Sequence, residues 1–353
     1  MNNLKVTFCI MGAVLAFALH AQTPPNLALQ FSNDCAQITV AGTVSNACTV
    51  QFSTNLTQVN SWHFQTNFVL TSAQMQFCDS NQSAARFYRA FTQLLPTNVV
   101  PISNMVWISP GTFIMGSPTN EALRNSDETQ HTVTLSRGFF MSKYLITQSD
   151  YMTLISTNPS FFTTNNGYTQ NLSRPVEEVS WINATNYCAL LTQQEMLAGR
   201  LPAGWVYRLP TESEWEYACR AGTLTAVYYG NELLSGMANF NGQLEYDAST
   251  GTINNPSGTF LSQTTVVGSY EANPWGLFDM CGNLYQWCED LYGSYPTGSV
   301  TDPQGATTGT TRVLRNNGWN AAGQYCRSAQ RDDFDPTGTF ANAGFRIVLA
   351  PSP

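Results

Sequence analysis

The pattern of apolar and polar residues changes along the chain, and the chain begins with an apolar run near its N-terminus. Lys5 is the only charged residue before this run, which extends from Val6 to Leu19, and Ala21 follows it as a small residue. A positive start, a short apolar run and a small residue at its end are typical of a secretory signal. The run is short for a membrane helix, which needs about 20 apolar residues. We therefore expect residues 1–21 to be removed and the protein to be exported to a periplasmic or extracellular location.

Residues 22–98 show short apolar and aromatic stretches that alternate with polar turns. Five stretches are rich in β-branched and aromatic residues: Gln37–Val40, Cys48–Phe52, Trp62–Thr66, Asn67–Leu70 and Arg86–Phe91. Short strands at this spacing predict a small all-β sandwich. The region is similar to the fibronectin-like modules that precede other domains in secreted bacterial proteins, and a spacer without a ligand is the simpler interpretation. A linker is expected at residues 99–103, around Pro101.

Residues 104–353 carry few long periodic segments, but three helices have recognisable starts. Thr147 is followed three residues later by Asp150, and Thr211 by Glu214, so each threonine is placed to cap a helix. Ser180 precedes a third apolar pattern, which ends near Gly199. The remainder is rich in Gly, Asn, Pro and Trp. We predict a loop-rich α+β domain that needs disulfides or bound cations as well as its core.

Composition and charge exclude several classes of function. The net charge of −8 becomes −9 once Lys5 leaves with the signal, and only 11% of residues are charged. An acidic chain with few Lys and Arg has no electrostatic footprint for nucleic acid or for an anionic membrane after signal cleavage. Of the three histidines, His20 lies in the signal, so His63 and His131 remain. Two distant histidines cannot build a zinc or iron centre that needs several of them.

Five separate segments in the second region share a resemblance to one family. They are MVWISPGTFIMGS at 105–117, RPVEEVSWINATNYC at 174–188, YRLPTESEWEYACRAG at 207–222, NPWGLFDMCGNLYQW at 273–287, and CRSAQR with AGFRIV between 326 and 348. In this order they resemble the formylglycine-generating (sulfatase-modifying) enzyme family. The resemblance implies a compact, loop-rich α+β fold related to C-type lectins. It does not by itself fix the chemistry, because fold and function are separable.

The family's oxidases hold copper(I) on a C-x-x-x-x-C pair and convert a cysteine of a sulfatase peptide to formylglycine. The pair follows a G-G-S-W-like segment, which here reads NNGW at Asn316–Trp319. Counting forward from Trp319 places the first family cysteine on Ala321 and the second on Cys326. Counting back from Arg331 shortens the loop and leaves Cys326 outside the active site. Under either count one thiol cannot replace two soft ligands, so we do not expect copper and assign no catalytic residue.

The resemblance also implies calcium at two places, because calcium prefers many oxygen ligands from loops. Asn239 and Phe240 match half of one site, whose other half needs an aspartate where Thr259 stands. The second site maps onto Asp279, Gly282, Leu284 and Gln286. Gln286 replaces a glutamate of the family, which keeps an oxygen but removes a charge. A loop held by hydrogen bonds alone is the alternative interpretation.

Eight cysteines remain after the signal is removed with Cys9. Three lie in the β-region (Cys35, Cys48 and Cys78) and five in the second domain (Cys188, Cys219, Cys281, Cys288 and Cys326). The sequence does not give their connectivity. The resemblance implies that Cys219 is bridged to a cysteine close to Cys326, so we expect the Cα atoms of these two residues within about 7 Å.

Two functions from different classes follow. The first is an exported, non-catalytic member of the sulfatase-modifying-factor family that binds a protein or a glycan. The alternative is a formylglycine-generating oxidase that acts on a sulfatase cysteine. The missing cysteine pair favours the first, and conversion of a C-x-P-x-R peptide would establish the second.

Overall fold

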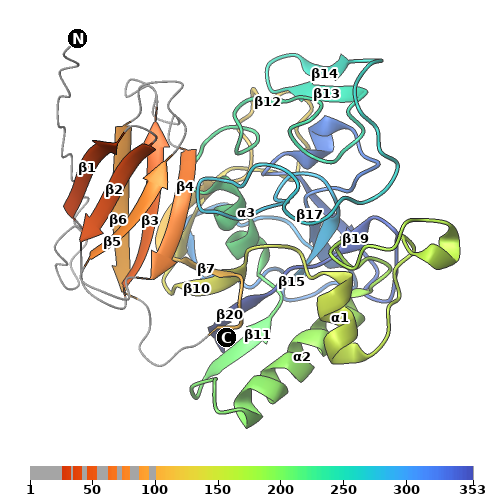
Figure 1. Cartoon of the computed structure of the whole chain (residues 1–353). Helices are drawn as coiled ribbons and strands as arrows, with labels where there is room; N and C mark the ends of the chain where they lie inside the picture. The colour runs from red at the N-terminus through yellow and green to blue at the C-terminus, as the bar shows by residue number, and fades with distance from the viewer. Residues whose placement is uncertain are drawn as a thin grey trace.

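The computed structural model describes the backbone of six strands within residues 26–94 and the whole of residues 101–352 (Figure 1). Within the six strands, side chains are described only for residues 38–41. The predicted signal at residues 1–21 lies outside the described residues. No helix in the described part of the chain is long and apolar enough to cross a membrane.

The first six strands form two antiparallel sheets of three strands. One sheet has the order β1-β2-β5, with bounds Asn26–Ser32, Cys35–Ala41 and Gln74–Asp79. The other has the order β4-β3-β6, with bounds His63–Val69, Asn46–Ser53 and Phe87–Leu94. The two strands expected at Trp62–Thr66 and Asn67–Leu70 are one continuous strand, β4, so that division was wrong. Whether the sheets pack as a fibronectin-like sandwich stays a prediction, since most of their side chains are not described.

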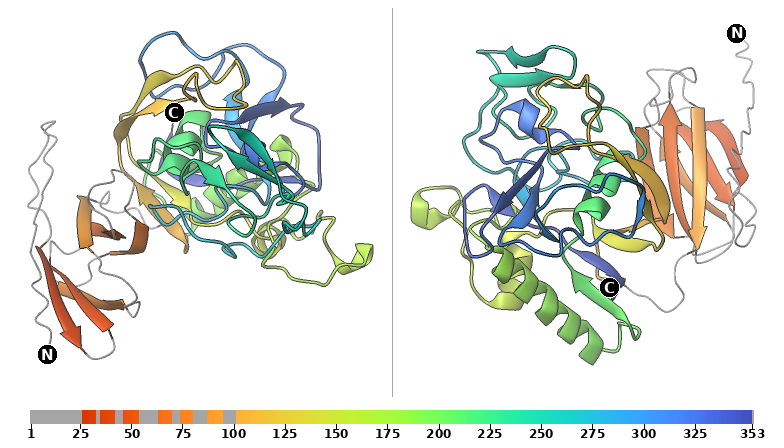
Figure 2. Two further views of the ribbon diagram at one scale, coloured as in Figure 1. Left: turned by 90° about the horizontal axis from the view of Figure 1, so that it is seen from above. Right: turned by 180° about the vertical axis from the view of Figure 1, so that it is seen from behind.

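The remaining strands form four small sheets (Figures 1 and 2). One has the order β11 (Trp205–Arg208), β20 (Val348–Pro351), β10 (Phe139–Ser142) and β7 (Met105–Ile108). A second has the order β18 (Arg331–Phe334), β17 (Arg312–Arg315), β15 (Tyr285–Leu291) and β19 (Ala343–Gly344). The others are β12 (Glu232–Leu233), β13 (Leu244–Asp247) and β14 (Gly251–Asn254), and β16 (Val300–Thr301), β9 (His131–Leu135) and β8 (Gly111–Met115).

The three predicted helices are confirmed together with their caps. They are α1 (Gln148–Ile155), α2 (Trp181–Leu197) and α3 (Glu212–Arg220), and two short 3-10 turns, η1 and η2, lie at Thr164–Asn166 and Gly323–Cys326. Thr147, Ser180 and Thr211 each accept a hydrogen bond from the third helical residue, whose side chain binds back to the cap. Such reciprocal bonds satisfy backbone N–H groups that the helix itself leaves free.

Two groups of buried residues make the core of the second domain. One surrounds Trp215 on α3 and the other surrounds Trp287 on β15, and both indoles are fully buried. α2 lies against β11 and buries Tyr187 and Leu191, whereas Ile182 and Leu190 lie on its solvent face. The domain is thus α+β, with short strands, three helices and much loop, as the sequence predicts. α3 carries four charged residues, and all four are buried: Glu212, Glu214, Glu216 and Arg220.

Candidate functional site

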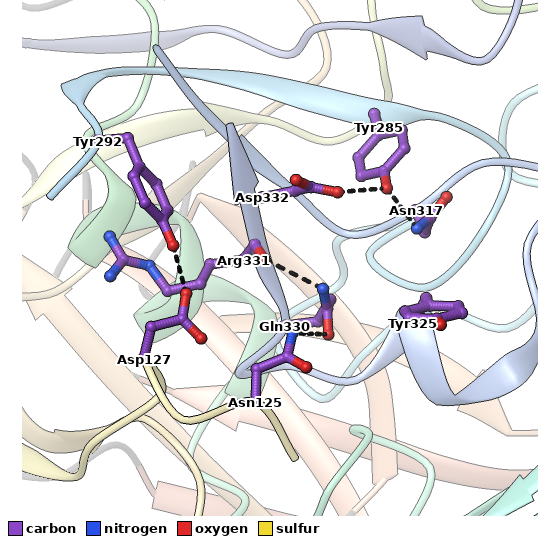
Figure 3. A pocket seen from close by; sticks show the side chains of 9 residues that line it. All are labelled: Asn125, Asp127, Tyr285, Tyr292, Asn317, Tyr325, Gln330, Arg331 and Asp332. Atoms are coloured by element: carbon purple, nitrogen blue, oxygen red, sulfur yellow. Dashed lines mark hydrogen bonds between the residues drawn. The ribbon is translucent and has the colours of Figure 1, made fainter. Parts of the chain in front are cut away.

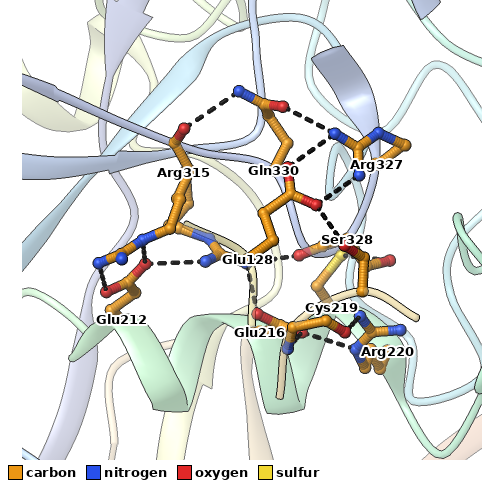
Figure 4. A network of polar contacts seen from close by, with 12 residues as sticks. Glu128, Glu212, Glu216, Cys219, Arg220, Arg315, Arg327, Ser328 and Gln330 are labelled. Carbon is orange, nitrogen blue, oxygen red and sulfur yellow. Dashed lines mark hydrogen bonds and ion pairs between the residues drawn. The ribbon is translucent and has the colours of Figure 1, made fainter. Parts of the chain in front are cut away.

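The buried charges of α3 hold both ends of one loop. β17 ends at Arg315 and β18 begins at Arg331, and both guanidinium groups bind the carboxylate of Glu212. Arg315 Nη1 donates to Glu212 Oε1 at 2.9 Å (Figure 4), while Arg331 donates to the two carboxylate oxygens at 2.8 and 2.7 Å. Arg315 also binds Glu216 at 2.7 Å. Because these charges are buried and paired, residues 316–330 begin and end at fixed points.

The middle of this loop is held by a second ion-pair group. Arg327 is buried and donates to Glu121 at 2.7 Å and to both carboxylate oxygens of Glu128 at 2.6 and 2.7 Å. Glu128 also accepts a bond from Ser117 at 2.6 Å. The loop that replaces the family's cysteine segment is therefore shaped by charge pairs with distant parts of the chain.

A pocket of about 440 Å³ opens beside this loop (Figure 3). Its lining residues come from three parts of the chain: Asn125, Asp127, Tyr285, Tyr292, Asn317, Tyr325, Gln330, Arg331 and Asp332. Every one of them carries a hydrogen-bonding group, and three carry a phenol ring. A volume of this size lies within the range of about 300–1,000 Å³ that is usual for small-molecule sites.

One wall of the pocket is a chain of hydrogen bonds. Asn317 Nδ2 donates to the Tyr285 hydroxyl at 2.6 Å, and that hydroxyl donates to Asp332 Oδ2 at 2.8 Å (Figure 3). Burial and the neighbouring Asp332 carboxylate raise the pKa of Tyr285 well above its ordinary value. Tyr285 therefore stays a neutral phenol, which serves binding better than proton abstraction.

On the opposite wall the guanidinium group of Arg331 is bonded to other protein groups. Arg331 binds Glu212 through Nε and Nη2, and its Nη1 donates to the Gly293 carbonyl at 2.8 Å. Its guanidinium also lies 4.5 Å from the ring centroid of Tyr292. The Tyr292 hydroxyl donates to Asp127. This wall consequently shows the pocket a phenol and a carboxylate, with the positive charge already neutralised.

Cys326 and Ala321 do not form a thiolate site. Cys326 ends η2, is fully buried and accepts a hydrogen bond on its carbonyl from the Cys281 thiol at 3.3 Å. Burial raises the pKa of the Cys326 thiol to about 12, and a protonated thiol is a poor metal ligand. Ala321 lies in a turn, and its own N–H donates to the Gly318 carbonyl at 3.1 Å. No thiol is among the residues that line the pocket, so the lining of this pocket does not fit copper(I).

The expected disulfide is not formed. Cys188, Cys219, Cys281, Cys288 and Cys326 are all buried and free. The Cys219 sulfur lies 3.6 Å from the Ser328 hydroxyl, so the residue that faces it is two positions beyond Cys326. The two residues are therefore not bridged, and that part of the prediction was wrong, while the approach of their Cα atoms to within about 7 Å stays a prediction. The side chains of Cys35, Cys48 and Cys78 lie outside the described residues.

Residues Asp279 to Gln286 do come together, but internal donors bind their oxygens. Asn316 Nδ2 donates to the carbonyls of Gly282 and Leu284 at 2.6 and 3.0 Å. The Gln286 side-chain oxygen accepts bonds from Trp215 and Arg346, both at 2.7 Å. The position between the two carbonyls is thus taken by an amide nitrogen, which does not fit calcium there.

The carboxylate of Asp279 is bound in the same way. Its Oδ2 accepts from the Gly268 N–H at 2.8 Å and its Oδ1 from Asn283 at 3.2 Å. Among the described residues, no group of three or more His, Cys, Asp or Glu is placed to hold a metal ion. Calcium binding as a whole stays a prediction for metal addition to test.

Asn239 and Phe240 lie beside this turn. Asn239 pairs with Gly282 in an isolated bridge, and its carbonyl accepts from the Asn283 N–H at 2.7 Å. A side chain on Gly282 would come within 2.4 Å of the Asn239 carbonyl, so this contact needs glycine. Asn239 Oδ1 is buried without a hydrogen-bond partner among the described residues, which leaves one oxygen for a cation or a water. Phe240 is buried in the core around Trp215.

The sequence did not predict this pocket. Asn125, Asp127 and Asp332 stand in polar stretches where nothing marks them as neighbours, and Tyr285 lies inside the motif at 273–287, which indicates the family. Asn317 and Tyr325 lie in the cysteine-segment equivalent, which was the available signal. Its cysteine pattern points to thiols, whereas its amide and phenol groups are what line the pocket.

A family model described as sulfatase-modifying factor enzyme 1-like domain matches residues 91–351. The formylglycine-generating enzyme of Streptomyces coelicolor is 35% identical over 185 residues, which cover 50% of this chain and 52% of that protein. The serine/threonine-protein kinase pkn1 of Chlamydia caviae is 36% identical over 181 residues, 49% of this chain and 24% of its own length. The chaperone protein LppX of Paenibacillus barcinonensis is 28% identical over 251 residues, 63% of this chain and 84% of that protein. This chain thus spans about a quarter of the length of the kinase and about half of that of the enzyme.

Two solved structures share the fold. Treponema denticola variable protein 1 superposes with a TM-score of 0.55 at 23% identity, over 77% of this chain and 98% of that one. PvdO from Pseudomonas aeruginosa superposes with a TM-score of 0.54 at 25% identity, over 70% of this chain and 94% of that one. The family model, the relatives and the shared fold agree on the second domain, and the chain belongs to the sulfatase-modifying factor family.

Proposed function

We propose that this chain is an exported, non-catalytic member of the sulfatase-modifying factor family that binds a ligand in the pocket beside Asn317. The observation that carries the proposal is the state of Cys326, the only thiol in the segment where the family's oxidases hold two. It is fully buried, does not line the pocket, and keeps its proton because burial raises its pKa to about 12.

Two further observations support binding over oxidation. The pocket walls are hydrogen-bonded phenols, amides and carboxylates whose geometry is already fixed, as a binding site requires. Relatives that share this domain carry the names of an enzyme that generates formylglycine, a kinase and a chaperone. One fold with several named roles is expected where function depends on the site and not on the fold.

The test of catalysis is direct. The purified chain is incubated with copper(I), oxygen and a C-x-P-x-R peptide, and the peptide is then weighed by mass spectrometry. We expect the cysteine to remain unchanged, while the S. coelicolor formylglycine-generating enzyme serves as positive control under the same conditions. Appearance of the peptide aldehyde with this chain would overturn the proposal and establish the oxidase.

The proposed export has its own test. The full chain is expressed in a bacterium, and the N-terminus of the accumulated protein is sequenced from the periplasm or the medium. We expect it to begin after Ala21, the small residue at the end of the apolar run. Recovery of the chain with Met1 in the cytoplasm alone would contradict export.

The β-strands that precede the domain are proposed to serve as a spacer.

A further inference from the structure

We propose that the pocket beside Asn317 binds the ring of an uncharged or amino sugar. The inference names a ligand class for the binding function proposed above and rests on it. Four properties of the pocket lead to this class: its charge, its spare hydrogen-bonding capacity, its aromatic faces and its lack of aliphatic lining.

The charge of the pocket excludes anionic ligands. Arg331 is the only cationic residue among those that line it, and all three terminal groups of its guanidinium bind Glu212 or the Gly293 carbonyl. Asp127 and Asp332 line the same space. A phosphate, sulfate or carboxylate would therefore face two carboxylates and one guanidinium that is already paired with Glu212, an unfavourable balance for a buried anion.

The hydrogen bonds already made leave the pocket rich in acceptors. The hydroxyls of Tyr285 and Tyr292 donate to Asp332 and Asp127, so both phenol oxygens can only accept further bonds. A carboxylate accepts at about four lone-pair positions, and each of these aspartates has positions left. A suitable ligand must accordingly supply donors, as a ring bearing several hydroxyl groups does.

The aromatic side chains supply the remaining surface. Tyr325 is 41% exposed and lines the pocket, so part of its ring is accessible. The face of a tyrosine is apolar while its hydroxyl is polar, which suits a ligand with C–H groups on one face and hydroxyls at its rim. Figure 3 shows Tyr325 on the same side of the view as Asn317 and Tyr285, with Tyr292 and Asp127 on the other side.

A basic peptide is the competing ligand, because its ammonium or guanidinium would also satisfy the two carboxylates. Peptide recognition usually adds apolar pockets for side chains or an exposed strand edge. None of the nine lining residues is aliphatic, so the stems of lysine or arginine would lie against polar groups. The sugar uses both the acceptors and the rings, and we commit to it.

The experiment begins with a glycan microarray that carries neutral, amino-sugar and anionic oligosaccharides. The best bound neutral or amino glycan is then titrated by calorimetry, and a Lys/Arg-rich peptide is titrated in parallel. We expect binding among the neutral or amino glycans and none among the anionic ones. Tyr325→Ala should weaken binding at least tenfold, and Asp332→Asn should weaken an amino glycan more than a neutral one.

Phe161→Ala is the matched control, since Phe161 is an aromatic residue with the same 41% exposure that does not line the pocket. It should leave the affinity unchanged. Binding confined to anionic glycans, binding confined to the peptide, no glycan binding, or binding that Tyr325→Ala and Asp332→Asn leave intact would each overturn the sugar proposal. These outcomes are separate from peptide oxidation, which alone decides whether the chain is catalytic.

Discussion

The thiol of Cys219 faces the hydroxyl of Ser328 across 3.6 Å, in the buried centre of the domain. Cys219 comes from α3 and Ser328 from the loop that Arg315 and Arg331 anchor. The resemblance placed a disulfide partner of Cys219 close to Cys326, and the structure places a serine there, two residues further on. The Cys219 thiol also lies 3.5 Å from the Met280 carbonyl, and a serine hydroxyl stands where a second sulfur would be needed for a bridge.

A Ser328→Cys variant should therefore form a disulfide with Cys219 under oxidising conditions. A sulfur in the place of the Ser328 hydroxyl would start 3.6 Å from the Cys219 sulfur, and we expect side-chain rotation to bring the two to the bonding distance of about 2.05 Å. Closing so long a loop should stabilise the fold by about 2–4 kcal/mol. Thiol titration in denaturant, with and without reductant, measures the bridge. The double variant Cys219→Ser/Ser328→Cys is the control, and an unchanged thiol count in the single variant would contradict the geometry.

Arg315 is predicted to be among the most sensitive residues of the domain. Its fully buried guanidinium joins Glu212 and Glu216, so Arg315→Met leaves two buried carboxylates with fewer partners. We expect a loss of about 3–5 kcal/mol in the free energy of unfolding. Arg200→Met is the comparison, because the Arg200 side chain is 48% exposed although its partner Glu195 is buried. Urea unfolding measures both, and equal effects would show that burial of the arginine does not matter.

Glu177 should give the fold a dependence on pH. It is fully buried and accepts the N–H groups of Phe161 and Phe162 at 2.9 and 3.2 Å. Burial, which outweighs these two bonds, raises its pKa from 4.5 to about 7. The folded state then holds the proton more firmly than the unfolded chain, so this stabilisation is complete below pH 4.5 and is lost as pH rises through about 7.

The measurement compares urea unfolding of the wild type and of Glu177→Gln between pH 4.5 and 7. Glu177 contributes a fall of at most ~1.4 kcal/mol per pH unit within this window. The variant should lack that part of the slope, while other buried acids contribute equally to both proteins. Parallel curves for the two proteins would mean that Glu177 does not titrate there.

We expect the side chain of Asn316 to hold the turn at Gly282 and Leu284 by hydrogen bonds, at the place where the family resemblance implies a calcium ion. It exchanges two bonds with the backbone of Gly282, at 2.8 and 2.6 Å, and donates a third to the Leu284 carbonyl. Asn316→Gly keeps the backbone angle, since φ is 65°, but removes these bonds. We expect a loss of about 1–3 kcal/mol for each buried group left unpaired.

Calcium distinguishes the two interpretations of this turn. Thermal unfolding of the wild type should not change with millimolar calcium or with a chelator, because the Asn316 amide lies between the carbonyls of Gly282 and Leu284. The Asn316→Gly variant frees both carbonyls and is the more favourable host for the ion. A clear calcium-dependent rise in the melting temperature of the wild type would instead confirm the calcium prediction.

Some features of this protein are determined by the sequence alone, because their physical causes are local. Thr147, Ser180 and Thr211 lie within three residues of the groups they cap, so the pattern was sufficient to predict α1, α2 and α3. The family, too, followed from short motifs such as the one around Trp215, since a capped helix with a buried indole leaves a recognisable stretch of sequence.

The site was decided by contacts between distant residues. Glu212 and Arg315 are 103 positions apart, and Cys219 and Ser328 are 109 apart. No local pattern states which of two nearby residues, Cys326 or Ser328, faces the Cys219 thiol, because that depends on the path of an anchored loop. In the same way Asp127 and Asp332 line one pocket because ion pairs hold residues 316–330 in place. Which charged residues form these ion pairs is decided only when the whole domain packs.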